Sequence, residues 1–125
     1  MAEIRVDKIQ NIDYNKNMDR NVPFIDKIVP MIVSLVSPDQ IILFGSYARG
    51  DNTEKSDIDL LILKKGLKNG REINNTLYRA FFENKIDISI DLISIDYNKY
   101  SELNNTIGYI YKTIKKEGKI LYGTL

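Results

Sequence analysis

The sequence predicts a small α/β (α+β) domain, in which a mixed β-sheet carries helices on one face and leaves the other face partly open. Three observations predict this fold. Residues 40–44 form a short run that is apolar from Ile41 onward, as in a buried strand. Residues 57–63 and 86–95 read as two further strands, and the second alternates apolar and polar side chains. Stretches with apolar residues at helical spacing flank these strands, in the order helix, strand, strand, helix, strand, helix.

Composition limits both the size of the core and the available chemistry. A chain of 125 residues with 43% hydrophobic residues builds one domain with a modest core. Lys plus Arg (18) nearly balance Asp plus Glu (17), so we expect no stable direct binding to nucleic acid. The chain has no cysteine and no histidine, which excludes disulfides, Cys-based zinc sites and histidine bases. Catalysis would have to use carboxylates, hydroxyls, Lys, Arg and a hard metal ion.

The first 20 residues are polar and weakly patterned, so we expect an N-terminal arm at 1–20 and a single domain at 21–125. The N-terminus has no apolar core of a signal peptide. No apolar run approaches the roughly 18 residues that a membrane span needs. The expected location is therefore the cytoplasm, without a membrane partner.

The first helix is expected to begin with Asn21 as its N-cap and Pro23 in its first turn. Apolar residues then recur at helical spacing up to residue 36. Pro30 lies inside this pattern and predicts a kink or a late start, and the Pro38–Asp39 pair ends the helix.

The second half of the chain alternates between helix and strand. Residues 71–84 predict an amphipathic helix, and residues 86–95 predict a strand with one face in the core. A single last helix is expected to run to Gly118, and residues 120–122 to pack back as a short tail. The last helix carries its apolar positions at Leu103, Ile107, Ile110 and Ile114.

The chemistry concentrates in residues 43–63, LFGSYARGDNTEKSDIDLLIL. Asp57 and Asp59 stand two apart on a predicted strand, so their side chains share one face at roughly 6.5 Å along the chain. Two neighbouring carboxylates repel each other unless a cation lies between them, and Mg²⁺ prefers such hard oxygen ligands. A third carboxylate from the 86–95 strand would allow a two-metal site for in-line displacement.

Gly45 and Ser46 end the first strand of this stretch and predict a phosphate-binding turn. Glycine allows the backbone to approach a ligand closely. A helical turn that begins at Ser46 would point its amide and hydroxyl at phosphate oxygens. Arg49 on the same turn either reaches the triphosphate or forms a structural ion pair within the loop.

These segments, LFGSYARG and SDIDLLIL with ten residues between Ser46 and Asp57, resemble the nucleotidyltransferase superfamily of DNA polymerase β. The spacing and small size are similar to the minimal nucleotidyltransferases, the MntA-type antitoxins that are paired with HEPN-domain ribonuclease toxins. The closing IKKEGKILYG is similar to their C-termini. The resemblance implies a polymerase β-like core and transfer of AMP from ATP to a tyrosine of the HEPN toxin. It also implies Mg²⁺ as cofactor and a hetero-oligomer with the toxin.

The resemblance also implies roles for individual residues. Gly45 and Ser46 match the nucleotide-binding turn, and Asp57 and Asp59 match the catalytic metal ligands. The third catalytic ligand follows the pattern apolar, Asp, apolar, apolar, which favours Asp91. Asp87 is its competitor. Outside this role, Asp87 and Asp96 are expected to be solvated strand-edge or helix-cap carboxylates.

Two alternatives to the adenylyltransferase antitoxin stay open. A binding module would neutralise the toxin by covering it, without catalysis. A small-molecule nucleotidyltransferase would resemble the aminoglycoside-modifying enzymes, but 125 residues leave little room for extra substrate-binding structure. We expect no acceptor pocket of obvious size, which favours another protein as the acceptor.

Overall fold

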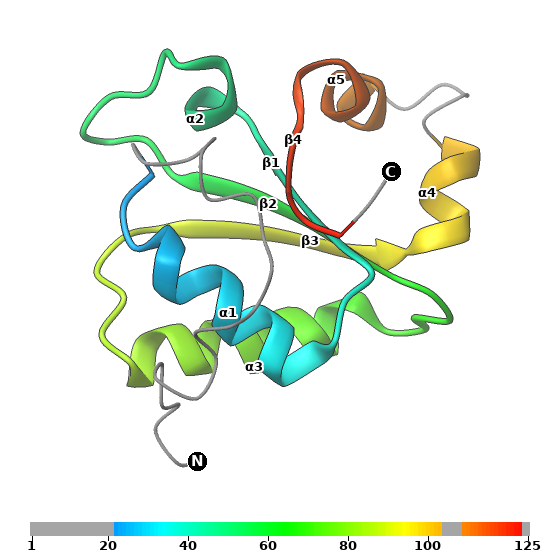
Figure 1. Cartoon of the computed structure of the whole chain (residues 1–125), viewed down its shortest axis with the longest axis horizontal. Helices are drawn as coiled ribbons and strands as arrows, with labels where there is room; N and C mark the ends of the chain where they lie inside the picture. Colours follow the sequence, from blue (N-terminus) through cyan, green and yellow to red (C-terminus); the bar gives the residue numbers. More distant parts are fainter. Residues whose placement is uncertain (1–21, 104–108, 124–125) are drawn as a thin grey trace.

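The computed structural model describes residues 22–103 and 109–123, so the predicted N-terminal arm and the proposed Asn21 cap lie outside the described residues. The chain forms a four-stranded sheet in the order β3-β2-β1-β4 with helices on both sides (Figure 1). The strands are β1 (Gln40–Phe44), β2 (Ile58–Lys64), β3 (Ile90–Asp96) and β4 (Lys119–Tyr122). The helices are α1 (Ile25–Val36), α2 (Ser46–Arg49), α3 (Gly70–Glu83), α4 (Tyr97–Leu103) and α5 (Tyr109–Glu117).

The sheet is mixed, as predicted. β1 pairs antiparallel with β2 and with β4, whereas β2 pairs parallel with β3. The parallel pair needs a crossover, and α3 supplies it between β2 and β3. The apolar run at 40–44 forms β1, a strand buried at every position, as its composition predicts.

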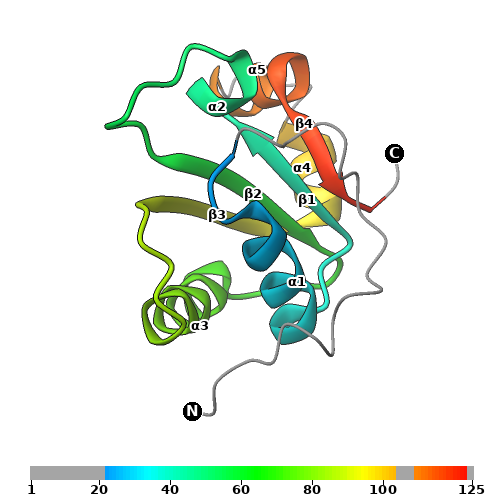
Figure 2. The ribbon, with the colours of Figure 1, turned by 60° about the vertical axis from the view of Figure 1, so that its left-hand side comes forward.

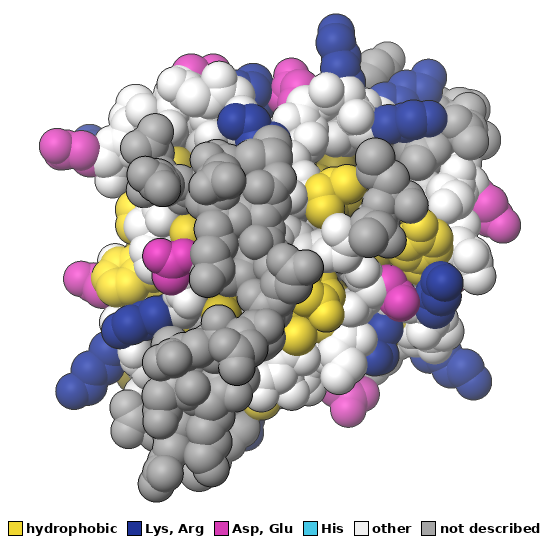
Figure 3. Space-filling view, viewed as in Figure 1, with side chains coloured by type: hydrophobic (Ala, Val, Ile, Leu, Met, Phe, Trp, Pro, Cys, Tyr) yellow, Lys and Arg dark blue, Asp and Glu magenta, His cyan; other side chains and the backbone are white. Residues whose placement is uncertain are grey.

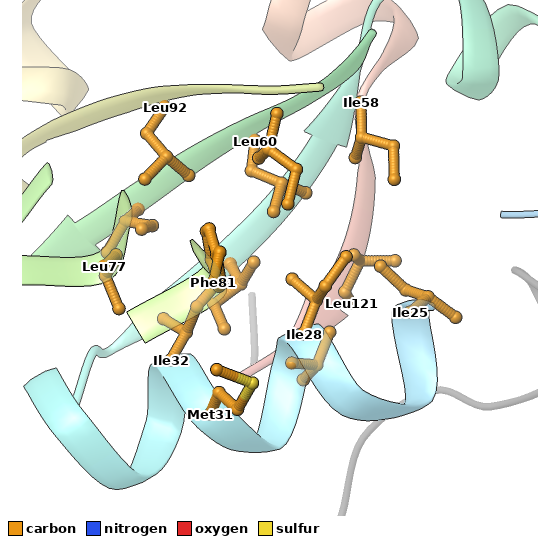
Figure 4. Packing of buried hydrophobic residues seen from close by; sticks show 14 of the residues in the cluster. Ile25, Ile28, Met31, Ile32, Ile58, Leu60, Leu77, Phe81, Leu92 and Leu121 are labelled. Carbon is orange, nitrogen blue, oxygen red and sulfur yellow. The ribbon is translucent and has the colours of Figure 1, made fainter. Parts of the chain in front are cut away.

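The larger core lies between the sheet and the helices α1 and α3, which cover the same face (Figures 1 and 2). Side chains of α1 point toward β2, β3 and β4, while Leu77 and Phe81 of α3 close the cluster from the side (Figure 4). Its fully buried members include Ile28, Ile32, Leu43, Ile58, Leu60, Ile62, Leu77 and Leu121.

The opposite face also carries helices, which corrects the prediction that helices lie on one face only. Alternate residues of the strands point to this side, and Tyr100 of α4 and Ile114 of α5 pack against them. The cluster comprises Ile42, Phe44, Leu61, Leu63, Tyr100 and Ile114. The part of this face that borders α2 and α5 carries the predicted aspartates.

The C-terminal region differs from the prediction in two ways. Two helices, α4 and α5, stand in place of the predicted single helix. α4 begins directly after β3, where Asp96 caps it: the Asp96 Oδ2 accepts a hydrogen bond from Lys99 N at 3.1 Å. Ile110 is 45% exposed rather than buried, and Ile107 lies outside the described residues. The predicted tail at 120–122 is strand β4, which pairs with β1.

α1 and β3 begin at other residues than the sequence predicts. α1 begins at Ile25 and runs through Pro30, so a late start after the proline is wrong. Phe24 precedes α1 in a left-handed conformation, φ 62°, which separates the helix from Pro23. β3 begins at Ile90 rather than Ile86, because Ile86 still belongs to the C-terminal turn of α3 and donates to Phe81 O at 3.0 Å.

Acidic and basic side chains are interspersed over the face shown in Figure 3. The net charge of the whole sequence is +1. Among the described residues, every helix is too short or too polar to cross a membrane.

Candidate active site

Two of the predicted aspartates are brought side by side by the parallel pairing of β2 with β3. Asp59 and Asp91 are register partners in this pair. Both lie on the face that carries Phe44, since Asp59 is also the register partner of Phe44 in the antiparallel pair with β1. Asp57 precedes β2 by one residue, and its charge acts on Asp59. The structure therefore gathers Asp57, Asp59 and Asp91 at one end of the sheet.

The other candidate, Asp87, lies elsewhere. Because β3 begins at Ile90, Asp87 belongs to the connection after α3 and not to the strand. Asp87 lines a hollow that Asp57 also lines, whereas Asp91 is the register partner of Asp59. The geometry thus favours Asp91 over Asp87 as the third acidic residue of the group.

Gly45 packs directly against the side chain of Asp59. It lies between β1 and α2 with φ 75° and ψ −156°, a conformation that only glycine adopts readily. A Cβ atom at this position would stand 3.0 Å from Cγ of Asp59 and would overlap its Oδ2. The absence of a side chain at Gly45 therefore allows the turn before α2 to approach the carboxylate.

The pKa of Asp59 is raised by burial and by the negative charges that lie close to it. Burial, followed by the charges of Asp91 and Asp57, raises the pKa of the Asp59 carboxyl to about 6. The positive charge of Arg49 acts in the opposite direction. Asp59 also shares a side-chain hydrogen bond with Asp91 that favours the protonated form. A cation placed here would remove the repulsion and favour the ionised carboxylates.

The donor set fits a hard divalent cation such as Mg²⁺, because it consists of carboxylate oxygens at a site where negative charge is in excess. The side chains are not arranged as a finished metal site: within residues 22–103 and 109–123, no group of three or more His, Cys, Asp or Glu residues meets that geometry. The chemistry of Asp57, Asp59 and Asp91 supports metal binding, and the ion itself would polarise phosphate oxygens.

Ser46 is the first residue of α2, as predicted for the phosphate turn. The carbonyl of Gly45 accepts the amides of Ala48 and Arg49 at 3.1 and 3.0 Å. The amides of Ser46 and Tyr47 come before these bonds in the helix and point out of its first turn. The turn therefore presents backbone donors next to the Asp59 carboxylate.

Arg49 forms ion pairs that hold α2 in place. Its Nε lies 3.2 Å from Asp51 Oδ2, and its Nη1 lies 3.3 Å from Glu117 Oε2 at the end of α5. The first pair is the structural ion pair within the loop, one of the two roles that the sequence allowed for Arg49. The second reaches across 68 positions in the sequence, and no local pattern points to it.

Residues of α3 that the sequence reasoning missed support the free edge of β3 next to Asp91. The hydroxyl of Tyr78 accepts the amide of Leu92 at 2.9 Å, and Nδ2 of Asn74 donates to the carbonyl of Leu92 at 3.3 Å. The Ser94 hydroxyl donates to Asn74 Oδ1 at 2.6 Å. These bonds satisfy backbone groups that an edge strand would otherwise expose. The only signal in the sequence was the spacing of four between Asn74 and Tyr78 on a predicted helix.

A hollow of about 710 Å³ lies beside Asp57, which corrects the expectation that no acceptor pocket of obvious size exists. One wall is the turn that precedes β2, held by a bond of 2.8 Å from Thr53 N to Ser56 Oγ. The other wall is the connection before β3. The lining includes Tyr47, Glu54, Lys55, Asp57, Asp87 and Ile88.

Comparison with known proteins identifies the family of this chain. The family model described as "Nucleotidyltransferase domain" matches residues 25–121. Two proteins of Methanocaldococcus jannaschii, provisionally named protein adenylyltransferases, match over shorter segments. One is 59% identical over 34 residues, 27% of this chain and 34% of that protein. The other is 79% identical over 24 residues, 19% of this chain and 24% of that protein. The matches thus span about a third or less of these relatives.

Solved structures share the fold. A toxin–antitoxin complex with AMP-PNP is 21% identical with a TM-score of 0.55, covering 78% of this chain and 72% of that chain. A mutant of the toxin–antitoxin MntA–HpeT is 20% identical with a TM-score of 0.55, covering 77% and 71%. A provisionally named nucleotidyltransferase from Sulfolobus solfataricus is 26% identical with a TM-score of 0.51, covering 75% and 72%. The identities to the two toxin–antitoxin structures show a common fold and nothing further.

Proposed function

Since the chain belongs to the nucleotidyltransferase domain family, we propose that it is a protein adenylyltransferase that moves AMP from ATP to a tyrosine of a partner protein. The partner in this proposal is a HEPN-domain ribonuclease toxin, and the chain is its antitoxin. The provisional names of the relatives and the toxin–antitoxin complexes of the same fold support this choice.

One observation carries the proposal: Asp59 lies between Gly45 on one side and Asp91 on the other. The glycine turn offers backbone amides to the phosphates of ATP, and the carboxylates stand directly beside it. Such a juxtaposition places a phosphate chain and an acidic group against each other, as nucleotidyl transfer requires.

In the proposed reaction the tyrosine oxygen attacks the α-phosphorus of ATP. A new O–P bond forms, the bond from the α-phosphorus to the bridging oxygen breaks, and pyrophosphate leaves with that electron pair. Asp91 is exposed whereas Asp57 and Asp59 are half-buried, so we assign the phenolic proton to the Asp91 carboxylate. Mg²⁺ bound by the three aspartates would neutralise the charge on the phosphates.

The test uses the purified full chain with ATP, Mg²⁺ and a HEPN protein encoded beside it. We expect the partner to gain the mass of adenylate on a tyrosine, and the double variant Asp57→Asn with Asp59→Asn to lose this activity. If the wild type leaves the partner unmodified while it still neutralises the toxin, the chain is a binding antitoxin and the enzymatic proposal fails.

The hollow beside Asp57 favours a second candidate, a small-molecule nucleotidyltransferase. Its volume of about 710 Å³ suits a small ligand, and Glu54, Asp57 and Asp87 on its lining favour a cationic one. Adenylation of an aminoglycoside in the absence of any partner protein would support this candidate. The same assay with Asp87→Asn tests whether the hollow holds the acceptor.

A further inference from the structure

The ion pair between Arg49 and Glu117 joins two parts of the chain that meet only in the folded protein. Arg49 ends α2, which follows the Gly45 turn, and Glu117 ends α5. The Arg49 guanidinium contacts Asp51 through Nε and Glu117 through Nη1, at 3.2 and 3.3 Å. The side chain of Arg49 is 42% exposed and that of Glu117 is 30% exposed, so a bound ligand can still reach the guanidinium.

The position of Glu117 is unfavourable for α5 itself. A carboxylate in the last turn of a helix lies at the negative end of the helix dipole, where cations are preferred. The two preceding residues, Lys115 and Lys116, follow that preference, and Glu117 does not. An exposed ion pair adds little stability, so a contribution to stability alone does not explain the carboxylate at this point.

The carboxylate of Glu117 is nevertheless held firmly relative to the nucleotide turn. Ile114, one turn earlier, is 1% exposed in the core on this face. Gly118, the next residue, donates its amide to Ile114 O at 2.7 Å and packs so closely that a Cβ atom would overlap Ile42 Cγ2. Lys119 then pairs with Leu43 of β1, the strand that directly precedes Gly45.

We propose that Glu117 is a positioning residue, which holds the Arg49 guanidinium at the edge of the triphosphate site formed by Gly45 and Ser46. This inference rests on the proposed function, because it assumes that phosphates bind at that turn. The positive charge of Arg49 already acts on Asp59 from this position. Without Glu117, the long Arg49 side chain would keep only its ion pair with Asp51, which lies two residues further along the chain.

Binding of AMP-PNP with Mg²⁺, measured by calorimetry, tests this role. We expect Glu117→Gln to weaken binding by about fivefold and Arg49→Gln by about tenfold. The double variant should bind as weakly as Arg49→Gln alone, because Glu117 acts only through Arg49. Glu83→Gln is the matched control, since Glu83 is also the last residue of its helix but lies on α3, and its binding should equal that of the wild type.

Four results would overturn the inference. Binding of Glu117→Gln equal to that of Glu83→Gln would show that the ion pair has no role, and tighter binding would show that Glu117 withholds Arg49 from the phosphates. Additive effects in the double variant would show that Glu117 acts independently of Arg49. A thermal midpoint of Glu117→Gln well below that of Glu83→Gln would show a role in folding.

The same measurements separate this inference from the proposed function. If the wild type does not bind AMP-PNP, both fail together. If the wild type binds AMP-PNP and the variants follow the expected order, but no adenylate reaches a partner, the positioning role stands and the proposed function fails.

Discussion

Gly45 and Asp59 are in such close contact that a methyl group on the glycine would overlap the Asp59 carboxylate. Gly45 lies between β1 and α2, and Asp59 is the register partner of Phe44, the last residue of β1. The two residues therefore define how closely a phosphate held by the turn can approach the acidic group.

Gly45→Ala should abolish most of the activity and destabilise the fold by about 2 kcal/mol, because it combines an unfavourable φ with a steric overlap. Gly66→Ala is the matched control. Gly66 also has a positive φ, 77°, but a Cβ atom there would meet nothing within 4 Å. It should cost about 1 kcal/mol and leave activity unchanged. Equal activities of the two variants, measured beside their urea unfolding curves, would contradict the steric role of Gly45.

Asp59→Asn should stabilise the metal-free protein at pH 7 while it abolishes transfer. Burial and the neighbouring Asp91 and Asp57 raise the pKa of Asp59 to about 6, so the native state binds its proton more tightly than the unfolded state. Stability from this group is present at low pH and is lost as the pH rises from about 4 to about 6. Given the solvent screening at a half-buried position, we expect a gain of about 1 kcal/mol at pH 7.

Asp96→Asn is the contrasting variant. Hydrogen bonds from the Lys99 and Gly66 amides hold the pKa of the Asp96 carboxyl below its ordinary value. Stability from Asp96 is therefore present above its unfolded pKa and is lost as the pH falls through its lower folded pKa. Urea unfolding at pH 7 should show Asp96→Asn less stable and Asp59→Asn more stable than the wild type. The same sign for both would contradict the assigned environments.

Divalent-cation binding should weaken as the pH falls through about 6, because a proton on Asp59 competes with the ion. The Mn²⁺ affinity is measured by calorimetric titration at about pH 5, 6 and 7.5, which lie on both sides of this pKa. Asp59→Asn should bind more weakly and lose most of this pH dependence. An affinity that is the same at all three pH values in the wild type would exclude Asp59 as a ligand.

Tyr78→Phe should destabilise the protein by about 1 kcal/mol, because the Leu92 amide loses its hydrogen-bond acceptor at the edge of β3. Hydrogen exchange at the Leu92 amide should become faster, since that amide is no longer protected. Tyr111→Phe is the control: its ring packs edge-on against Tyr100 at 6.1 Å, a contact that the variant keeps. Unchanged exchange at Leu92 in Tyr78→Phe would show that the edge is protected by other groups.

Local patterns predicted most elements, and the errors have physical causes. The 40–44 run is buried at every position and hydrophobic after Gln40, so its pattern was unambiguous. Ile86 continues the alternation of β3 by chance, since it packs beneath the end of α3. The C-terminal periodicity likewise spans α4 and α5, because helical spacing alone does not reveal a break between two helices.

The sequence by itself determined the parts of the candidate site that are close along the chain: the Gly45–Ser46 turn, and Asp57 and Asp59 at strand spacing. Only the tertiary structure decided their neighbours. The parallel register of β2 and β3 brings Asp91 rather than Asp87 beside Asp59, and the packing of α5 brings Glu117 to Arg49. The physical reason is that spacing sets which face of one element a side chain occupies, whereas pairing register and helix packing set what lies opposite.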